Sequence, residues 1–279
     1  MLPLLVSTPH SSGHVPYWIL ARMLQTGESE AGLRRRLFKE GDPFTDALFN
    51  IPDADTTLNA PASRFVADLN RERNEAGANG VIKLTDFERR PFYPTGYQLS
   101  PKEREMRLSL YYDPYHAALE KALGPGGASG PGPGGGRIRF FLDGHSMTAQ
   151  GPAIGPDQGK PRPALCIGNF GDTDGEPVSG PVSCAAPLAR GIRDKLAELL
   201  KGPIDESGLP EGPALNHPFD GGHILRKYSL APFAVPGVMI EINRTLYLDE
   251  ETLQPIPGRL EAVSKAMSRL AAWILANLP

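Results

Sequence analysis

The sequence predicts an α/β protein whose mainly parallel sheet is covered by helices on both faces. Short segments rich in β-forming residues alternate with amphipathic helical segments along the chain, and this alternation is typical of parallel sheets. Several of the short segments end abruptly in His, Asp or Glu. Open parallel sheets place their functional side chains beyond the carboxyl ends of the strands, so the same pattern predicts a site there.

Five segments have the composition and the boundaries of strands. Each is short, contains apolar β-forming residues and is bounded by Gly, Pro or Asp. Together they are expected to form the sheet. We expect these strands near residues 4–7, 64–69, 138–143, 164–167 and 236–242.

The longest predicted helix has clear start and stop signals. Ser100 is a capping residue, Pro101 suits the first helical position, and Glu103 stands where a capping box requires it. The amphipathic pattern continues to about Leu123 and stops at Gly124. Two more helices are expected, and their apolar faces should pack on the sheet. They cover residues 183–201 and 258–277.

Length and composition fit one domain over residues 1–279. The chain has 279 residues, of which 40% are hydrophobic, and its formal net charge is −3. This charge gives no reason to expect nucleic acid or an anionic membrane as a partner. Residues 124–136 are almost entirely Gly and Pro, and we expect them to form a flexible loop. No Gly-Lys-Ser/Thr follows them, as it would in a phosphate-binding loop.

The sequence also indicates a cytoplasmic protein. The apolar stretch before Thr8 is short, has no basic flank and no cleavage pattern, so we expect no signal peptide. No segment approaches the ~20 apolar residues of a membrane span. Cys166 and Cys184 are too few for a disulfide framework and lack the paired spacing of a metal site. Both are expected to be buried thiols.

Two histidines at strand ends are candidate metal ligands. His10 follows the first predicted strand in a loop of Ser, Gly and Pro, and neutral imidazole is a common metal ligand. His145 follows another strand, two residues after Asp143. In an extended chain those two side chains share a face, so Asp143 can fix the histidine tautomer that binds a metal. A capping Asp143 beside a surface histidine is the alternative, and His14 is a weaker candidate.

Two candidate residues have competing explanations. Residues 144–148, around Ser146, are one residue short of the Gly-x-Ser-x-Gly elbow of serine hydrolases. Loop residues follow where that elbow needs a helix, so a serine hydrolase is disfavoured. Asp42 precedes Pro43 at a predicted helix start, where a capping role explains it as well as a metal-binding role does.

Glu241 is the candidate for acid–base chemistry. It stands in the apolar run 238–242, where an unpaired buried carboxylate would be costly. Arg244 can compensate the charge. A glutamate at a strand end beside a metal-bound water is also what a general base requires, with its pKa raised by a low-dielectric site.

The segment around Asp68 alternates polar and apolar residues and suggests a binding edge. Arg64, Asp68 and Asn70 would lie near one edge of the sheet, with Arg71 following. Arginine suits bidentate binding of a substrate carboxylate. Asp68, like Asp143, is expected to lie next to the metal ligands and to orient them without binding the metal.

Taken together, these motifs resemble the N-formylglutamate amidohydrolase family, which is related to the zinc carboxypeptidases and to aspartoacylase. The resemblance covers most of the chain, and its specificity lies in the order and separation of the motifs. It implies a phosphorylase/hydrolase-like fold, a three-layer α/β/α sandwich with a mixed, mostly parallel sheet. The motifs are Pro9-His10-Ser11-Ser12, Asp42 with Asp46 and Leu48-Phe49, residues 64–71, residues 111–116, residues 143–147, Gly221-Gly222 and residues 241–244.

The resemblance implies a zinc site. His10 and His145 would be ligands, and the carboxylate ligand would come from Asp42 or, as the alternative, from Asp46. Zinc carboxypeptidases take this carboxylate from the third residue after the first histidine, but that residue is Gly13 here. Histidine and carboxylate ligands also suit other divalent metals.

The resemblance also implies the reacting groups. Glu241 matches the catalytic glutamate, and Arg64 matches an arginine that polarises the carbonyl. Asn70 and Arg71 match a pair that holds a substrate carboxylate, and Arg244 would be a second carboxylate contact.

The implied activity is zinc-dependent hydrolysis of the linear amide N-formyl-L-glutamate to formate and glutamate, so the expected partner is a small dicarboxylate-type amide. Zinc would lower the pKa of a bound water toward ~7, and Glu241 would take its proton. Another N-acyl-amino-acid deacylase, a zinc carboxypeptidase and a non-catalytic protein that binds an acidic ligand are the alternatives. His116, His217 and His223 are expected to have structural roles.

Overall fold

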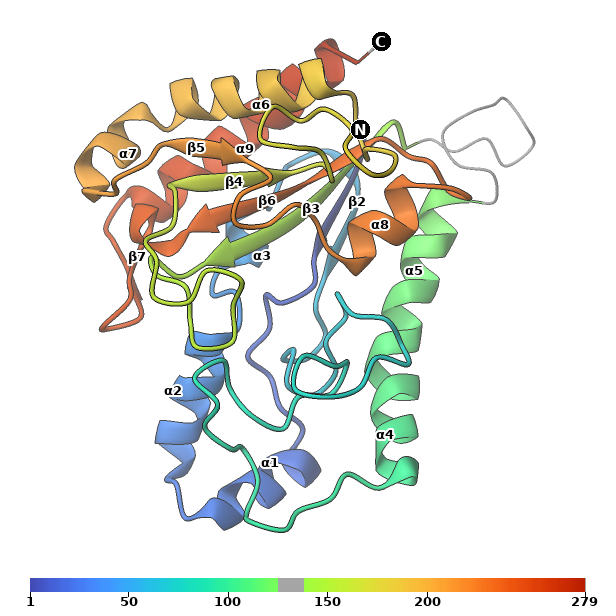
Figure 1. The fold of residues 1–279 in the computed structure, drawn as a ribbon, viewed down its shortest axis with the longest axis vertical. Coiled ribbons are helices and arrows are strands. Elements are labelled where there is room, and N and C mark those ends of the chain that lie inside the picture. The colour runs from blue at the N-terminus through green and yellow to red at the C-terminus, as the bar shows by residue number, and fades with distance from the viewer. Residues whose placement is uncertain (125–137, 279) are drawn as a thin grey trace.

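The computed structural model describes residues 1–124 and 138–278 and contains one large sheet (Figure 1). Apart from Gly124, the predicted loop over residues 124–136 lies outside the described residues. The six strands of the sheet are arranged in the order β2-β1-β3-β6-β4-β5. They are β1 (Leu2–Thr8), β2 (Ala54–Asn59), β3 (Phe140–Met147), β4 (Leu165–Gly168), β5 (Pro213–Leu215) and β6 (Gly237–Asn243).

The sheet is mixed and mostly parallel, as predicted. β1 pairs in parallel with β2 and with β3, β3 pairs in parallel with β6, and β4 with β5. β4 runs antiparallel to β6. Because β2, β1, β3 and β6 point the same way, their carboxyl ends form one edge of the sheet. His10, His145 and Glu241 come from this edge.

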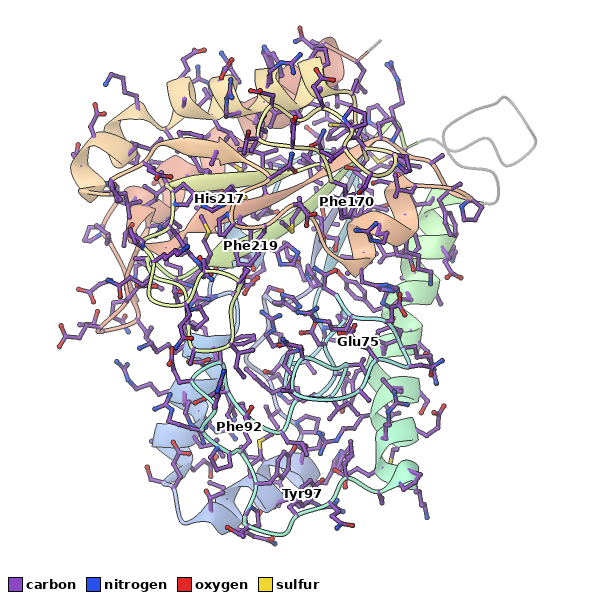
Figure 2. The ribbon with its side chains drawn as sticks, in the orientation of Figure 1. Glu75, Phe92, Tyr97, Phe170, His217 and Phe219 are labelled. Atoms are coloured by element: carbon purple, nitrogen blue, oxygen red, sulfur yellow. The ribbon has the colours of Figure 1, made fainter. Side chains whose placement is uncertain are left out.

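Beyond that edge lies a region built from short helices and irregular chain. It contains α1 (Tyr17–Met23), a 3-10 turn (Leu24–Thr26), α2 (Glu30–Glu40) and most of the chain between β2 and α4 (Pro101–Arg107). A separate apolar cluster holds this region together, and it includes Phe65 and Phe92 with Tyr97 packed against it. Phe92 and Tyr97 lie far from the sheet in Figure 2. The candidate site therefore lies between the sheet and the apolar cluster that contains Phe65 and Phe92.

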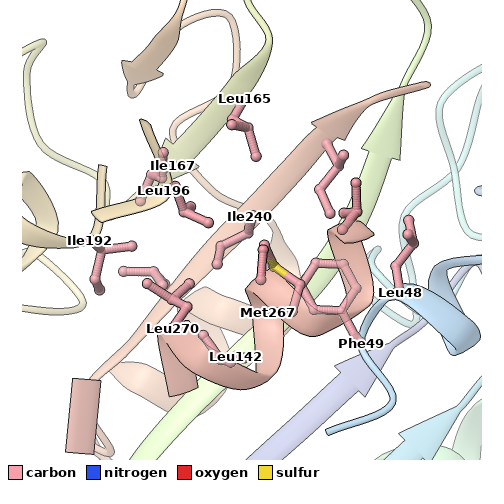
Figure 3. Close-up of a cluster of buried hydrophobic side chains, with 14 of the residues drawn as sticks. Leu48, Phe49, Leu142, Leu165, Ile167, Ile192, Leu196, Ile240, Met267 and Leu270 are labelled. Atoms are coloured by element: carbon pink, nitrogen blue, oxygen red, sulfur yellow. The ribbon is translucent and has the colours of Figure 1, made fainter. Parts of the chain in front are cut away.

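Helices cover both faces of the sheet and complete a three-layer sandwich. α3 (Thr45–Leu48), α6 (Ala186–Leu199) and α9 (Arg259–Ala276) pack on one face, and α5 (Asp113–Leu123) and α8 (His223–Ser229) pack on the other. Leu142 and Ile240 of the strands meet Met267 in the first core (Figure 3). Adjacent strand residues alternate between the two cores, as the pleat requires: Leu4 lies in the first and Leu5 in the second.

The remaining elements are short. They are a π-helical turn (Leu108–Tyr112) between α4 and α5, α7 (Lys201–Ser207), a 3-10 turn (Arg244–Leu246), and the small hairpin of β7 (Leu248–Asp249) and β8 (Gln254–Pro255). None of the helices in the described ranges is long and apolar enough to cross a membrane. Cys166 and Cys184 are free, buried thiols, as predicted.

Most sequence-based elements are confirmed. Four of the predicted strands correspond to β1, β3, β4 and β6, and the three predicted helices correspond to the α4–α5 segment, α6 and α9. Ser100 caps α4, since its side chain accepts from the Glu103 N–H at 3.2 Å. The π-helical turn widens the α4–α5 helix in its middle, which the amphipathic pattern did not reveal.

The strand predicted over residues 64–69 is wrong. This segment is a series of turns, in which Val66 N–H donates to Ser63 O at 2.8 Å. Its apolar side chains enter two different cores: Phe65 and Val66 lie in one, and Ala67 and Leu69 lie in the other. The edge strand of the sheet, next to β1, is instead β2, which was not predicted. Its threonine-rich sequence is only partly buried because it lies at the sheet edge.

Gly144, between the candidate residues Asp143 and His145, provides a test of the packing of β3. A Cβ atom there would lie 2.6 Å from the ring of Phe49. We expect Gly144→Ala to lower the free energy of unfolding by about 1–3 kcal/mol because the ring cannot move without disturbing the core. Gly212→Ala is the matched control, since a Cβ there meets nothing within 4 Å. Equal urea midpoints for both variants would contradict this account.

Candidate metal centre and active site

The structure brings together the three predicted metal ligands. His10 follows β1, His145 lies on β3, and Asp42 lies in the loop between α2 and α3. All three are buried, and one ligand atom from each lies within 4.8 Å of the others. The two imidazole ring centroids are 5.0 Å apart. Two strands that are neighbours in the sheet thus join histidines that are far apart in the sequence.

The two histidines present the same ring nitrogen to the centre of this cluster. The Nδ1 atoms of His10 and His145 lie 3.4 and 3.1 Å from the Asp42 Oδ2 atom. The opposite nitrogens are next to other carboxylates: His10 Nε2 lies 2.8 Å from Asp68 and His145 Nε2 lies 3.2 Å from Asp143. Metal-binding histidines typically have this arrangement, with a carboxylate behind each ring.

The residues present fit a divalent cation. His10 Nδ1 is buried and has no hydrogen-bond partner within the described chain. Such an orphaned nitrogen is costly unless it binds something. Two imidazoles and one carboxylate are also a common ligand set of catalytic zinc. The metal prediction is therefore compatible with the donor atoms of the cluster.

Asp42 does not cap a helix, so the capping explanation is wrong. The residue at the N-cap of α3 is Phe44, and the Asp42 carboxylate instead accepts from Ser146 N–H at 3.3 Å beside the two imidazoles. Burial alone would raise the pKa of Asp42, but His10, His145 and the Arg64 charge hold that pKa well below its usual range. Asp46, the alternative ligand, is exposed and lies outside the cluster.

Arg244 anchors the loop that carries Asp42. Its Nη1 donates to Lys39 O at 2.6 Å, Nη2 donates to Gly41 O, and Nε donates to Ser146 Oγ at 3.3 Å. The guanidinium is buried, and its Nη2 lies 3.9 Å from Asp42 Oδ1. These bonds give Arg244 a structural role in the site, while its role as a substrate contact stays a prediction.

Asp68 is buried beside the His10 ring and contacts several charged groups. Its Oδ2 accepts from Arg64 Nη2 at 2.9 Å and from Lys83 Nζ at 2.7 Å, while its Oδ1 faces His10. Burial alone would raise the pKa of Asp68, but the charges of Arg64 and Lys83 hold it well below the usual range. The carboxylate is therefore ionised. Arg64 also has its Nη1 3.6 Å from Asp42 Oδ1.

The Asp143 carboxylate is itself in contact with a buried hydroxyl group. Ser7 Oγ donates to Asp143 Oδ1 at 3.3 Å and lies 2.9 Å from the Tyr115 hydroxyl. Ser146, the candidate nucleophile of the alternative serine hydrolase, lies within β3 and is hydrogen-bonded to Arg244. A strand residue in this setting is not a nucleophile elbow, because no sharp strand-to-helix turn exposes its hydroxyl.

The cluster opens into a cavity of about 980 Å³. Glu241 lies in this cavity and pairs in register with His145 across β3 and β6. Burial raises the pKa of the Glu241 carboxyl, an effect opposed by His145. Phe219, which is labelled in Figure 2, is another residue of the cavity wall. The predicted residues lining the cavity are His10, Asp42, Arg64, Asn70, Arg71, His145, Glu241 and Arg244.

Asn70 and Arg71 differ in how they are held. The Asn70 Oδ1 atom accepts from Ile224 N–H at 2.8 Å, and its Nδ2 lies 3.3 Å from His145 Nε2. The Arg71 Nε atom is buried without a hydrogen-bond partner in the described residues, and the nearest carboxylate to its guanidinium, on Glu75, lies 3.8 Å away. Arg71 therefore retains a donor for an anionic ligand.

The model of the N-formylglutamate amidohydrolase family matches residues 2–248. This chain belongs to that family. Its relatives include N-formylglutamate deformylase of Pseudomonas putida, which is 28% identical over 89% of this chain and 83% of the relative. The enzyme of the same name from Pseudomonas aeruginosa is 26% identical over 98% of this chain and 94% of the relative.

A solved structure supports the fold of this N-formylglutamate amidohydrolase family member. The crystal structure of N-formylglutamate amidohydrolase from Ralstonia eutropha JMP134 matches with a TM-score of 0.66 and 21% sequence identity. The match covers 99% of this chain and 95% of the other chain. A gene product of Agrobacterium tumefaciens matches with a TM-score of 0.54 and 18% identity, over 99% of this chain and 91% of that one.

Two residues that contact the carboxylates behind the histidines, or the groups that hold them, were not among the predicted site residues. Lys83 is buried against Asp68, and burial lowers its pKa to about 8 while Asp68 opposes that shift. Its signal in the sequence was a lysine between Ile82 and Leu84. Tyr115 belongs to the motif over residues 111–116, but its contact with Ser7 had no signal, because the two residues are far apart in the chain.

The remaining histidines are not part of the metal cluster. His14 is exposed, whereas His116 is buried, with Nε2 3.0 Å from Leu69 O and Nδ1 2.8 Å from the Tyr228 hydroxyl. Because Leu69 O can only accept, His116 Nε2 carries the proton and Nδ1 accepts from Tyr228. His116 is therefore held at both ring nitrogens by the folded chain, and it lies outside the metal cluster.

The buried His116 predicts how stability depends on pH. Burial and the nearby Lys227 lower the pKa of His116 from 6.5 to about 3. Between these values the unfolded chain binds a proton that the folded chain does not, so the free energy of unfolding should fall as the pH decreases below about 6.5. His116→Gln should remove up to about 1.4 kcal/mol of this loss per pH unit. Urea unfolding of the wild type and of His116→Gln between pH 7 and about pH 4 measures this difference. Parallel curves of unfolding free energy against pH would contradict the assignment.

Proposed function

We propose that this protein hydrolyses N-formyl-L-glutamate to formate and glutamate, using a divalent metal ion, with zinc as the first choice, held by His10, Asp42 and His145. The observation that carries the proposal is the convergence of these three donors in one cavity with Glu241. Membership of the N-formylglutamate amidohydrolase family supports the substrate, as do the names of the two Pseudomonas relatives.

The metal would add one kind of chemistry to the site. A bound divalent ion would polarise the amide carbonyl and make water more acidic. Asp68 and Asp143 would keep the two imidazoles in the tautomer that exposes Nδ1. The buried loop contacts of Arg244 would hold Asp42 in place.

Glu241 would move the proton in the reaction. The carboxylate lies in the cavity next to His145 in the sheet register. It would accept a proton from the attacking water and return it to the departing amine nitrogen. The Nη1 atom of Arg64 lies on the side of Asp42. This nitrogen would stabilise the negative charge that develops on the carbonyl oxygen.

Asn70 and Arg71 would bind a carboxylate of the substrate. Arg71 has a buried Nε without a partner, and a bound carboxylate would satisfy it. The Asn70 side chain is fixed beside His145, so it would place the substrate relative to the metal cluster. Fixed placement of the amide beside Glu241 lowers the entropic part of the barrier.

A formate-release assay tests the proposal directly. The purified protein is stripped with a chelator, reloaded with zinc, cobalt or manganese, and incubated with N-formylglutamate, N-acetylglutamate and a glutamyl dipeptide. We expect formate release by the metal-loaded protein and none by the stripped protein. Turnover of the acetyl compound or the dipeptide without formate release would instead indicate another deacylase or a carboxypeptidase. No turnover in any arm would reject the proposed function.

A further inference from the structure

Two side chains from one helix hold the main chain on both sides of Asn70. Tyr112 donates its hydroxyl proton to Arg71 O at 2.8 Å, and His116 Nε2 lies 3.0 Å from Leu69 O. The two bonded carbonyls belong to the residues immediately before and after Asn70. We propose that Tyr112 and His116 are positioning residues that fix Asn70 and Arg71 for substrate binding. This inference rests on the proposed function of that pair.

The helix geometry brings the two side chains to the same place. Tyr112 and His116 are four residues apart, so they share a helix face, and their rings lie 4.1 Å apart between centroids. Tyr112 ends the π-helical turn, and His116 lies in α5 directly after it. Single wide turns of this kind are rare and occur frequently at functional sites.

The side chain of Asn70 is fixed from the opposite side. Ile224 N–H, in the first turn of α8, donates to Asn70 Oδ1 at 2.8 Å. A Cβ atom on Gly222 would lie 2.3 Å from Asn70 Nδ2, so the glycine backbone approaches the amide closely. The Ile224 N–H donor needs an acceptor, so the end of the amide that faces it is Oδ1 and not Nδ2. The amide therefore has one orientation, provided that its main chain does not shift.

His116 has the tautomer that its hydrogen bond to Leu69 O requires. Because Leu69 O can only accept, Nε2 is the donor to it, and Nδ1 is left as the acceptor 2.8 Å from the Tyr228 hydroxyl. Burial and Lys227 lower its pKa, so the ring stays neutral and keeps this tautomer at neutral pH. The Tyr112 hydroxyl also lies 3.3 Å from His223 Nε2. The bond to Leu69 O is thus present whenever the protein is folded near pH 7.

Loss of either contact should weaken substrate binding more than it slows the chemical step. Asn70 and Arg71 would touch a carboxylate that does not react, and such contacts act equally in the ground state and the transition state. Removing one of the hydrogen bonds behind them should therefore raise KM with little change in kcat. A purely structural defect behaves differently, because it lowers the fraction of active protein and so lowers kcat at constant KM.

The test compares four variants of the metal-loaded, full-length protein. Tyr112→Phe removes one hydroxyl and keeps the ring. His116→Leu removes the donor to Leu69 O, whereas His116→Gln retains an N–H that can reach it. Tyr97→Phe is the matched control, because it removes a tyrosine hydroxyl bonded to Glu103 at 2.9 Å, far from the cavity. KM and kcat for N-formylglutamate are measured for each, together with Kd for glutamate and Tm.

We expect Tyr112→Phe and His116→Leu to raise KM and the glutamate Kd by about 3- to 10-fold, the range for one lost hydrogen bond. His116→Gln should restore most of the affinity, and Tyr97→Phe should match wild type. Unchanged KM and Kd in both Tyr112→Phe and His116→Leu, or a fall in kcat alone, would overturn the positioning role. If the wild type did not hydrolyse N-formylglutamate, the proposed function would fail, and the glutamate Kd would still decide the positioning role.

Discussion

Replacing Glu241 by glutamine is expected to lower kcat for N-formylglutamate by about 100- to 10,000-fold. Glutamine keeps the size of the side chain but cannot take a proton from the attacking water. Because Glu241 is not one of the three clustered ligands, the metal content should stay at the wild-type value. Steady-state kinetics and elemental analysis of the same preparations measure both quantities.

The matched control is Glu250→Gln. Glu250 lines the same cavity, but its carboxylate accepts from Ala149 N–H at 3.4 Å and has no assigned part in the reaction. We expect this variant to keep the wild-type kcat. Wild-type kcat in Glu241→Gln, or equal losses in the two variants, would contradict the role of Glu241 as general base.

The second large effect is expected from His145→Ala, which should abolish stoichiometric metal binding and activity together. His145 supplies one of only three donors in the cluster formed by the described residues, and alanine leaves Asp42 and His10 without a third donor. Asp143→Asn should have a smaller effect, about 10- to 100-fold in metal affinity, because Asp143 only supports the ring from behind. Mass spectrometry of the metal content and a zinc titration of activity measure the difference.

The two variants should also respond differently to added metal. Excess zinc should restore activity to Asp143→Asn, because all three donors remain, but not to His145→Ala. A His145→Ala protein that still contains one metal ion per chain would show that the ion binds elsewhere. Equal recovery of the two variants would contradict the distinction between a ligand and its support.

The parts of the fold that depend on local sequence were predicted well. Residues 258–277 carry a helical apolar stripe, and they form α9 (Arg259–Ala276). His10 and His145 were predicted to meet because both follow strands of one parallel sheet, and the β1–β3 pairing brings them together. In both cases a short-range pattern and one general rule about parallel sheets were sufficient.

The errors arose where contacts between distant residues decide the structure. The pattern around Asp68 looked like a strand, but the segment is irregular, and its first apolar residues enter one core while the later ones enter another. Asp42 had an adequate local explanation as a cap, and its position beside His145 in the structure shows that this explanation is wrong. The contacts of Tyr112 and His116 with residues 69–71 likewise depend on tertiary packing and had no local signal.

The bonds from Arg244 to Lys39 O and Gly41 O have a consequence for the order in which the protein matures. On the ribosome, His10, Asp42 and His145 all emerge before the last strand of the sheet has been synthesised. Until Arg244 follows, the segment that carries Asp42 lacks its anchor, and Glu241 is also missing. We therefore expect a nascent chain that stops before β6 to bind zinc weakly, so that metal uptake marks the end of folding.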